Sequence, residues 1–349
     1  MSGILIATDA WRPQINGVVL SLERMSAAAR ELGAEISFLT PKGFAALPLP
    51  GYSEIKLAFP MPGEIARRVE SAAPDHIHIA TEGPVGLLTR NYCCKRALAF
   101  TSGYHTRFPE YISSRLPIPE AWSYAALRRF HAPSHAVMTP TASMRDILVR
   151  RGFANVRIWS RGVDHLLYRP RATPTLDLPH PIFLNVGRVA VEKNLAAFLD
   201  SDLPGSKVVV GDGPALASLK ARFPLAHFLG AKQGDELAAI FASADVFVFP
   251  SRTDTFGIVL IEALASGLPV AGYPVPGPLD IIGTSKAGVL SEDLRSACLA
   301  ALSIPREVAR AQSLQFTWKR SAQQFLGHIE DCRRRAPRAT NKPTASFAG

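Results

Sequence analysis

Short apolar runs alternate along the chain with longer segments in which apolar residues recur at helical spacing. Residues 4–7 and 182–186 are runs of the first kind, typical of buried strands, and a polar loop follows each of them. After the first loop, Val18, Leu22 and Met25 repeat with a helical period. Because the order strand, loop, helix recurs in both halves, we predict an α/β fold with parallel sheets covered by helices on both faces.

This alternation is interrupted between residues 160 and 180 by a charged passage that contains one Gly and three Pro residues. Such a passage predicts a linker between domains, and a chain of 349 residues with 47% hydrophobic content is long enough for two cores. We therefore predict an N-terminal domain of residues 1–170 and a C-terminal domain of residues 171–315. A helix at 316–334 and a disordered tail at 336–349 follow.

The most informative unit is a strand, loop and helix start with the sequence FVFPSRTDTFGIVLIEALASGLPVA. The backbone N–H groups of Phe256, Gly257 and Ile258 begin the helix, where unpaired donors and the helix dipole favour an anion. Asp254 precedes this helix end and Glu262 follows eight positions later, and carboxylates accept hydrogen bonds from vicinal hydroxyls. The unit predicts a ligand with both phosphate and sugar, the alternative being an ordinary βα unit with surface acids.

Other candidate residues lie just beyond further strands or in the linker. Gly17 lets a ligand approach the start of a helix closely, or else serves a tight turn. His105 stands where an imidazole can face a cleft, although a lone histidine is more often structural. Arg188 and Lys193 can hold a diphosphate, the alternative being two solvated loop charges. Arg161 in the linker is expected to be solvated, with a cleft-facing position as the alternative.

Several strings carry a resemblance to a known family, in this order: P-x-x-N-G-V, Y-H-T-R-F-P, G-V-D, G-R-x-x-x-E-K-N and P-S-R-T-D-T-F-G. Together they resemble the retaining glycosyltransferases of GT-B fold, family 4. This family more often has Glu at the position that Asp254 occupies here. The resemblance implies two Rossmann-like doubly wound domains that face a central cleft, and a last helix that packs back on the N-terminal domain.

The resemblance also implies roles for individual residues. Arg188 and Lys193 stabilise the leaving diphosphate, and Glu262 binds the ribose. Asp254 fixes the hydroxyls of the sugar, and His105 contacts the sugar near its reacting carbon. His105, Arg188, Lys193 and Asp254 are therefore expected to be catalytic. Donor binding is expected from Gly17, Arg188, Lys193, Gly230, Ala231, Lys232, Asp254, Thr255, Phe256, Gly257, Ile258 and Glu262.

Charge and cysteine content add the expected partners. The net charge of +10, from 39 basic and 29 acidic residues, predicts attraction to an anionic partner. The four cysteines lack metal-ligand spacing. Because basic residues at the diphosphate can replace a divalent cation, we expect no metal and no cofactor besides the nucleotide sugar that is the substrate.

The T-D-T-F-G string resembles that of the sulfoquinovosyl-, glucosyl- and glucuronosyl-diacylglycerol synthases. With the positive charge, this resemblance implies a membrane lipid, diacylglycerol first, as the acceptor, and a UDP-linked glucose, glucuronic acid or similar hexose as the donor. Residues 108–130 mix aromatic side chains with arginines, which is typical of an interfacial segment and also of a loop packed over a core. No signal peptide or long apolar run is evident. We therefore expect a cytoplasmic protein, peripheral on the anionic inner face of the cell membrane.

Two alternatives stay open at this point. A GDP-mannose-dependent α-mannosyltransferase acting on a lipid or polysaccharide has the same motifs. A basic protein that only binds nucleic acid is a more distant alternative, because the sequence shows neither aromatic residues interleaved in a basic groove nor a known binding motif. We expect no nucleic-acid partner, and the sequence leaves the oligomeric state open.

Overall fold

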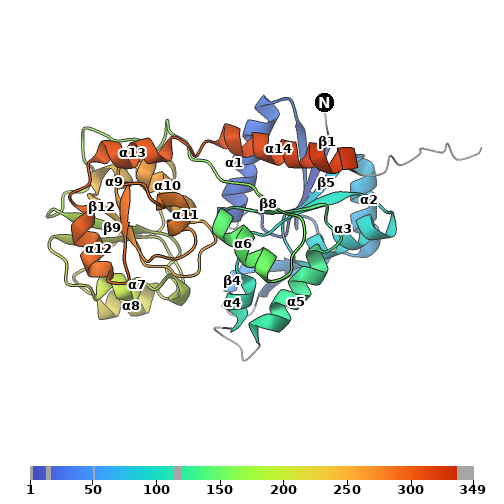
Figure 1. The fold of residues 1–349 in the computed structure, drawn as a ribbon. Helices are drawn as coiled ribbons and strands as arrows, with labels where there is room; N and C mark the ends of the chain where they lie inside the picture. The colour runs from blue at the N-terminus through green and yellow to red at the C-terminus, as the bar shows by residue number, and fades with distance from the viewer. Residues whose placement is uncertain (1–2, 13–16, 50–51, 114–118, 336–349) are drawn as a thin grey trace, which may run out of the picture.

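The computed structural model describes residues 3–12, 17–49, 52–113 and 119–335. The chain forms two lobes, each built around its own parallel sheet (Figure 1). The predicted α/β class with two Rossmann-like domains is confirmed. The tail predicted at 336–349 lies outside the described residues.

The N-terminal lobe alternates strands and helices along the chain. Its elements are β1 (Gly3–Ala7), α1 (Gly17–Glu31), β2 (Glu35–Leu39), β3 (Ala46–Leu49), β4 (Tyr52–Ala58), α2 (Pro62–Ala72), β5 (His76–Ile79), α3 (Pro84–Lys95), β6 (Phe100–Gly103), α4 (Phe108–Ser113), α5 (Glu120–His131), β7 (Ala136–Thr139), α6 (Ala142–Arg150) and β8 (Val156–Ile158). Six strands form a parallel sheet in the order β2-β1-β5-β6-β7-β8. The inner strands are buried throughout because helices cover both faces.

The C-terminal lobe repeats this plan. Its elements are β9 (Ile182–Val186), η1 (Val191–Lys193), α7 (Leu195–Leu199), β10 (Ser206–Val210), α8 (Leu216–Arg222), β11 (His227–Phe228), α9 (Gly234–Ser243), β12 (Val246–Phe249), α10 (Ile258–Ala265), β13 (Val270–Gly272), α11 (Pro278–Ile282), β14 (Gly288–Leu290), α12 (Leu294–Ala301) and α13 (Arg306–Ser313). The sheet order is β11-β10-β9-β12-β13-β14, all parallel. Connections reverse direction between β9 and β12, and ligands of doubly wound sheets bind at such a switch point.

One element was not predicted from the sequence. β3 and β4 form an antiparallel hairpin between β2 and α2, pairing Ala46 with Ala58 and shifting register between Pro48 and Leu49. A proline inside one strand and a register shift obscure the strict alternation by which strands are predicted.

The last helix, α14 (Trp318–Arg335), returns to the N-terminal lobe and lies beside α1 (Figure 1). Phe325 and Ile329 are buried in the same core cluster as Trp159, which follows β8. The Trp159 indole also donates a hydrogen bond to Ser321 Oγ at 3.1 Å. A segment from the end of the chain therefore completes the core of the first lobe.

The chain crosses between the lobes twice, and the two crossings lie against each other. Val163 of the linker forms an isolated parallel bridge with Thr317, just before α14. Gly162 has no room for a side chain, since a Cβ there would lie 2.2 Å from the backbone nitrogen of Trp318. The lobes are also joined directly, because the Ser143 amide donates to Asp280 Oδ1 at 3.0 Å.

We predict that Phe325→Ala lowers the free energy of unfolding by about 3–5 kcal/mol, because it opens a cavity between α14 and the N-terminal core. Denaturant unfolding followed by tryptophan fluorescence measures this change. Gln323→Ala, on the exposed face of the same helix, is the control and should change stability by less than about 0.5 kcal/mol. Equal effects of the two substitutions would show that α14 does not stabilise the lobe.

Candidate active site between the two lobes

An ion pair lies at the carboxyl edge of the C-terminal sheet. Lys193 Nζ donates to Asp254 Oδ1 at 2.5 Å, and both side chains are mostly buried. Burial raises the pKa of Asp254, but the charge and hydrogen bond of Lys193, together with Ser251 and the charge of Arg107, hold the pKa below its ordinary value. The second carboxylate oxygen, Oδ2, is buried and has no hydrogen-bond partner among the described residues. It is therefore an available acceptor for a ligand hydroxyl.

The fold brings these residues together because they follow neighbouring strands. β9 and β12 are paired, so the loops after them leave the sheet at the same point. Asn194 Nδ2 fixes the two loops by donating to the Pro250 carbonyl at 3.1 Å. Arg188, two residues beyond the end of β9, leaves from this edge as well. The switch point thus carries Arg188, Lys193 and Asp254.

The start of α10 combines core packing with a tight backbone turn. Gly257 caps the helix at φ +83°, and a Cβ there would approach Leu260 and Phe249 side-chain atoms at 3.0 Å. The Phe256 ring is 5% exposed and packs edge-on against Phe316 in the core. Phe256 therefore offers a ligand only its backbone, whereas its side chain anchors the loop.

Glu262 lies in the second turn of α10 and is 5% exposed. Burial raises its pKa to about 7, although a hydrogen bond from Tyr168 and the charge of Arg24 oppose the increase. Arg24 belongs to α1 of the other lobe and pairs with Asp164 of the linker at 3.5 Å. Glu262 therefore faces the junction between the lobes and the linker.

Two contacts place the N-terminal lobe against the loop that contains Asp254. Thr255 Oγ1 donates to the main-chain carbonyl of His105 at 2.7 Å. A Cβ on Gly17 would lie 3.6 Å from Ile258 Cδ1. The strand-end loops of both lobes therefore meet where the sequence predicted the reacting sugar to bind.

The structure corrects one expectation. Arg161 is not solvated, since it is only 5% exposed. Its guanidinium donates to the Trp159 carbonyl at 2.7 Å and to His105 Nδ1 at 2.7 Å. The residue was mistaken for a surface charge because a Gly-containing charged linker is usually exposed, whereas this segment passes beneath the loop after β6.

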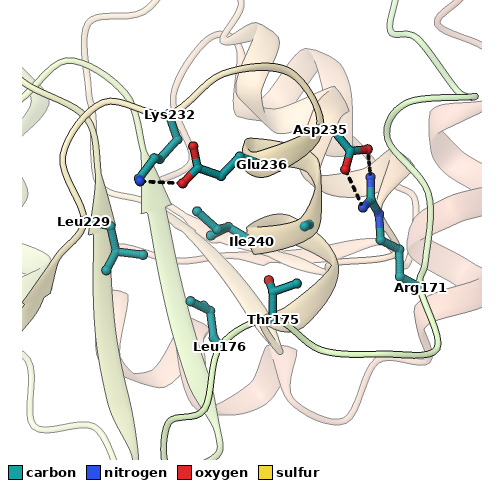
Figure 2. A pocket seen from close by; sticks show the side chains of 9 residues that line it. Arg171, Thr175, Leu176, Leu229, Lys232, Asp235, Glu236 and Ile240 are labelled. Atoms are coloured by element: carbon teal, nitrogen blue, oxygen red, sulfur yellow. Dashed lines mark hydrogen bonds and ion pairs between the residues drawn. The ribbon is translucent and has the colours of Figure 1, made fainter.

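Gly230, Ala231 and Lys232 follow β11, two strands from β9 along the same edge, or roughly 10 Å at the usual strand spacing. The Gly230 carbonyl accepts from the Gly211 amide at 2.8 Å, which fixes the loop. Figure 2 shows a pocket of about 480 Å³ beside Lys232, with an apolar floor that includes Ile240. Lys232 pairs with Glu236 at its rim. This arrangement can hold a flat base next to polar groups.

Three residues near the site were missed from the sequence. The charge of Arg107, in the loop after β6, lowers the pKa of Asp254, and the charge of Arg24 lowers that of Glu262. Tyr168 in the linker bonds to Glu262. Arg24 lies seven residues, two helical turns, after Gly17 and so shares its helix face. Arg107 lies two residues after His105, and this proximity to a predicted site residue could have identified it from the sequence.

Within the part of the chain that the structure describes, no group of three or more His, Cys, Asp or Glu side chains is arranged to hold a metal ion. The sequence reasoning overlooked a D-x-D string at Asp200 and Asp202. The carboxylate of Asp200 pairs with Arg222, and that of Asp202 with Arg295, in exposed ion pairs after α7.

The architecture and the strand-end cluster define the class. Sucrose-phosphate synthase from Thermosynechococcus elongatus superimposes with a TM-score of 0.75 at 18% identity, covering 95% of this chain and 99% of that one. At this identity the likeness shows the fold, which is the two-domain GT-B glycosyltransferase fold.

The family follows from the sequence of each lobe. Residues 15–165 match the family model described as Glycosyltransferase Family 4, and residues 180–304 match the model described as Glycosyl transferases group 1. The chain belongs to the family 4 glycosyltransferases of GT-B fold, as its motifs predicted. Glycosyltransferase activity is therefore its class of function.

Curated relatives differ in what they transfer. A GDP-mannose-dependent alpha-mannosyltransferase of Mycobacterium tuberculosis (strain CDC 1551 / Oshkosh) is 28% identical over 95% of this chain and 97% of its own length. Sulfoquinovosyl transferase SQD2 of Arabidopsis thaliana is 29% identical over 74% of this chain and 57% of its own length. Alpha-monoglucosyldiacylglycerol synthase of Streptococcus pneumoniae (strain ATCC BAA-255 / R6) is 25% identical over 93% of this chain and 83% of its own length.

The pKa of Glu262 makes stability depend on pH. Because the folded chain keeps this proton up to about pH 7 while the unfolded chain loses it near pH 4.5, stability falls as pH rises between these values. Glu262→Gln should remove this loss and be more stable than the wild type by about 3 kcal/mol at pH 8, with no difference near pH 4.5.

Urea unfolding at several pH values measures both chains. The exposed Glu307→Gln in the same lobe is the control for loss of one negative charge. A difference between Glu262→Gln and wild type that stays constant with pH would contradict the assignment.

Proposed function

We propose that this protein is a retaining glycosyltransferase that moves a hexose from a nucleoside diphosphate sugar to a membrane lipid. One observation carries the proposal: the Lys193–Asp254 pair lies at the switch point of the C-terminal sheet and meets the N-terminal lobe through the bond from Thr255 to the His105 carbonyl. A cation for the leaving group and an acceptor for sugar hydroxyls thus stand together at the junction of the lobes.

In this proposal Arg188 and Lys193 bind the diphosphate and stabilise the negative charge that grows on it as the bond to the sugar breaks. These two cations take the place of a divalent metal ion. Glu262 binds the ribose hydroxyls, and the free Oδ2 of Asp254 accepts from a sugar hydroxyl. The loop at Gly230 and the pocket beside Lys232 receive the base.

The state of Asp254 favours retention without a covalent glycosyl-enzyme intermediate over retention by double displacement. Its carboxylate is already bound to Lys193, so it orients hydroxyls and is a poor nucleophile. We infer a displacement on one face of the sugar, in which the leaving phosphate takes the proton of the acceptor hydroxyl. Closure of the lobes around the donor then limits hydrolysis.

A lipid acceptor is supported by one of the relatives, whose name specifies a glucosyldiacylglycerol product. The N-terminal lobe also exposes large apolar side chains, with Trp122 of α5 at 72%, Met61 at 69% and Phe59 at 53%. None of the described helices combines the length and apolar content needed to cross a bilayer. We propose that the lobe binds the cytoplasmic face of the membrane peripherally, helped by the positive net charge.

Two donors are proposed. UDP-linked glucose or glucuronic acid with diacylglycerol as acceptor is the first. GDP-mannose is the second, favoured by a mannosyltransferase relative that this chain matches over nearly the whole length of both proteins. Incubation with a panel of nucleotide sugars and extracted lipids, with products identified by mass spectrometry and anomers by NMR, decides between them. Absence of any lipid-linked product would refute the lipid acceptor.

Lys193→Ala and Glu262→Ala should each lower kcat/KM for the donor about a hundredfold, roughly 3 kcal/mol, because each removes a hydrogen-bonding contact to the nucleotide sugar. Initial rates at subsaturating donor measure the loss. Lys220→Ala, an exposed change on α8, is the control and should keep the wild-type rate. Near-normal rates in either site variant would remove that residue from the site.

Trp122→Ser should weaken binding to anionic phosphatidylglycerol vesicles about tenfold, because a large apolar side chain no longer enters the membrane interface. Vesicle sedimentation at low salt measures the bound fraction. The matched control is Leu225→Ser, which removes a side chain that is 92% exposed on the C-terminal lobe and should leave binding unchanged. If the wild type does not sediment with these vesicles, the membrane proposal fails.

A further inference from the structure

Arg161 is a buried cation that forms no ion pair with a carboxylate in the described part of the chain. Its Nη1 donates to the Trp159 carbonyl at 2.7 Å and to the Ser160 carbonyl at 3.3 Å. Its guanidinium carbon lies 4.3 Å from the centre of the Trp159 ring. Burial lowers the pKa of Arg161 to about 9. Main-chain carbonyls and the Trp159 ring therefore surround this buried charge in place of a carboxylate.

Arg161 also contacts the ring of His105. Arg161 Nη2 lies 2.7 Å from His105 Nδ1, and a guanidinium can only donate hydrogen bonds. Nδ1 must therefore present its lone pair, which places the proton of the neutral ring on Nε2. A second proton on the ring would have to enter at Nδ1, where it would break this bond and put two cations in contact.

The surroundings of the ring point the same way. Burial, followed by the charge of Arg161 and the neighbouring His78 of β5 and His131 of α5, holds the pKa of His105 well below its usual value. The ring packs over Gly103, where a Cβ would lie 2.6 Å from Nε2. Nε2 is buried and has no partner among the described residues. The imidazole thus lies inside the N-terminal lobe.

The main-chain carbonyl of His105 contacts the C-terminal lobe. The His105 carbonyl accepts from Thr255 Oγ1, beside Asp254, on the other lobe. Hydrogen bonds therefore hold both groups of this residue, the ring through Arg161 and the carbonyl through Thr255. A carbonyl oxygen at this place offers the negative end of its dipole to a sugar that becomes positive as its diphosphate leaves.

We propose that Arg161 is a positioning residue: it holds the His105 ring as the neutral Nε2–H tautomer against Gly103 and so fixes the His105 carbonyl at the sugar-binding loop. His105 then acts in transfer through its carbonyl, and its imidazole moves no proton. The proposal has two halves. The conformational half, that Arg161 fixes the tautomer and position of the His105 ring, does not depend on the proposed function. The catalytic half, that His105 acts in transfer through its carbonyl, rests on the proposed glycosyl transfer.

The conformational half is tested by long-range ¹H–¹⁵N NMR of the histidine rings in the full chain. In the wild type we expect His105 to show a protonated Nε2 and an unprotonated Nδ1 from pH 5.5 to 8, without titration. Arg161→Met should give mixed tautomers or titration in this range, and Arg161→Lys, which still donates a hydrogen bond, should restore the wild-type spectrum. A wild-type ring with its proton on Nδ1 overturns the proposal without any assay of transfer.

The matched control is Arg306→Met. Arg306 is another partly buried arginine that donates to main-chain carbonyls, those of Ala242, Ala244 and Ser266, but it contacts no histidine. This control should lower stability without changing the His105 signals. Gly103→Ala displaces the ring while leaving Arg161 intact, and it should reproduce the effect of Arg161→Met, so the test survives if Arg161→Met does not fold.

The catalytic half is tested by kinetics once a donor is identified. Arg161→Met should lower kcat ten- to a hundredfold and change the donor KM less than threefold, because the misplaced carbonyl is needed in the transition state. The kcat of the wild type should show no loss near pH 6 that depends on His105. An acid limb that disappears in His105→Gln would show that the imidazole is a general base and overturn this half alone.

Discussion

The ion pair between Lys193 and Asp254 is the interaction on which the candidate site depends. It exists because β9 and β12 are neighbours at the point where the strand order of the C-terminal sheet reverses. The pair helps to keep an acidic side chain charged in a mostly buried position, since Lys193, Ser251 and Arg107 together lower the pKa of Asp254 by more than burial raises it. It also orients the carboxylate, leaving one oxygen bound and the other open.

A balance of charges extends from this pair to the opposite lobe. Arg107 acts on Asp254, and Arg24 acts on Glu262, both from the N-terminal lobe. Asp254 and Glu262 thus each interact electrostatically with an arginine that belongs to the other lobe. The candidate site is consequently complete only when both lobes are in place, so ligand binding there would depend on the relative position of the lobes.

Features that a short segment encodes by itself could be predicted from the sequence. The strand, loop and helix around Asp254, the βα order and the two-lobe plan all follow from local patterns. The hairpin of β3 and β4 was missed because a proline and a register shift hide its alternation. Arg24, Tyr168 and the burial of Arg161 depend on segments that meet only after folding, and no local pattern reports such a meeting.

The return of α14 to the N-terminal lobe has a consequence for how the molecule can be divided. Because both ends of the described chain belong to one lobe, the C-terminal lobe is topologically an insert between β8 and α14. A chimaera that joins the N-terminal part of one homologue to the C-terminal part of another would therefore combine parts of the N-terminal core from two different proteins. A chimaera that replaces only the internal segment, with both crossings as the junctions, keeps that core whole and is the sound way to exchange donor preference between relatives.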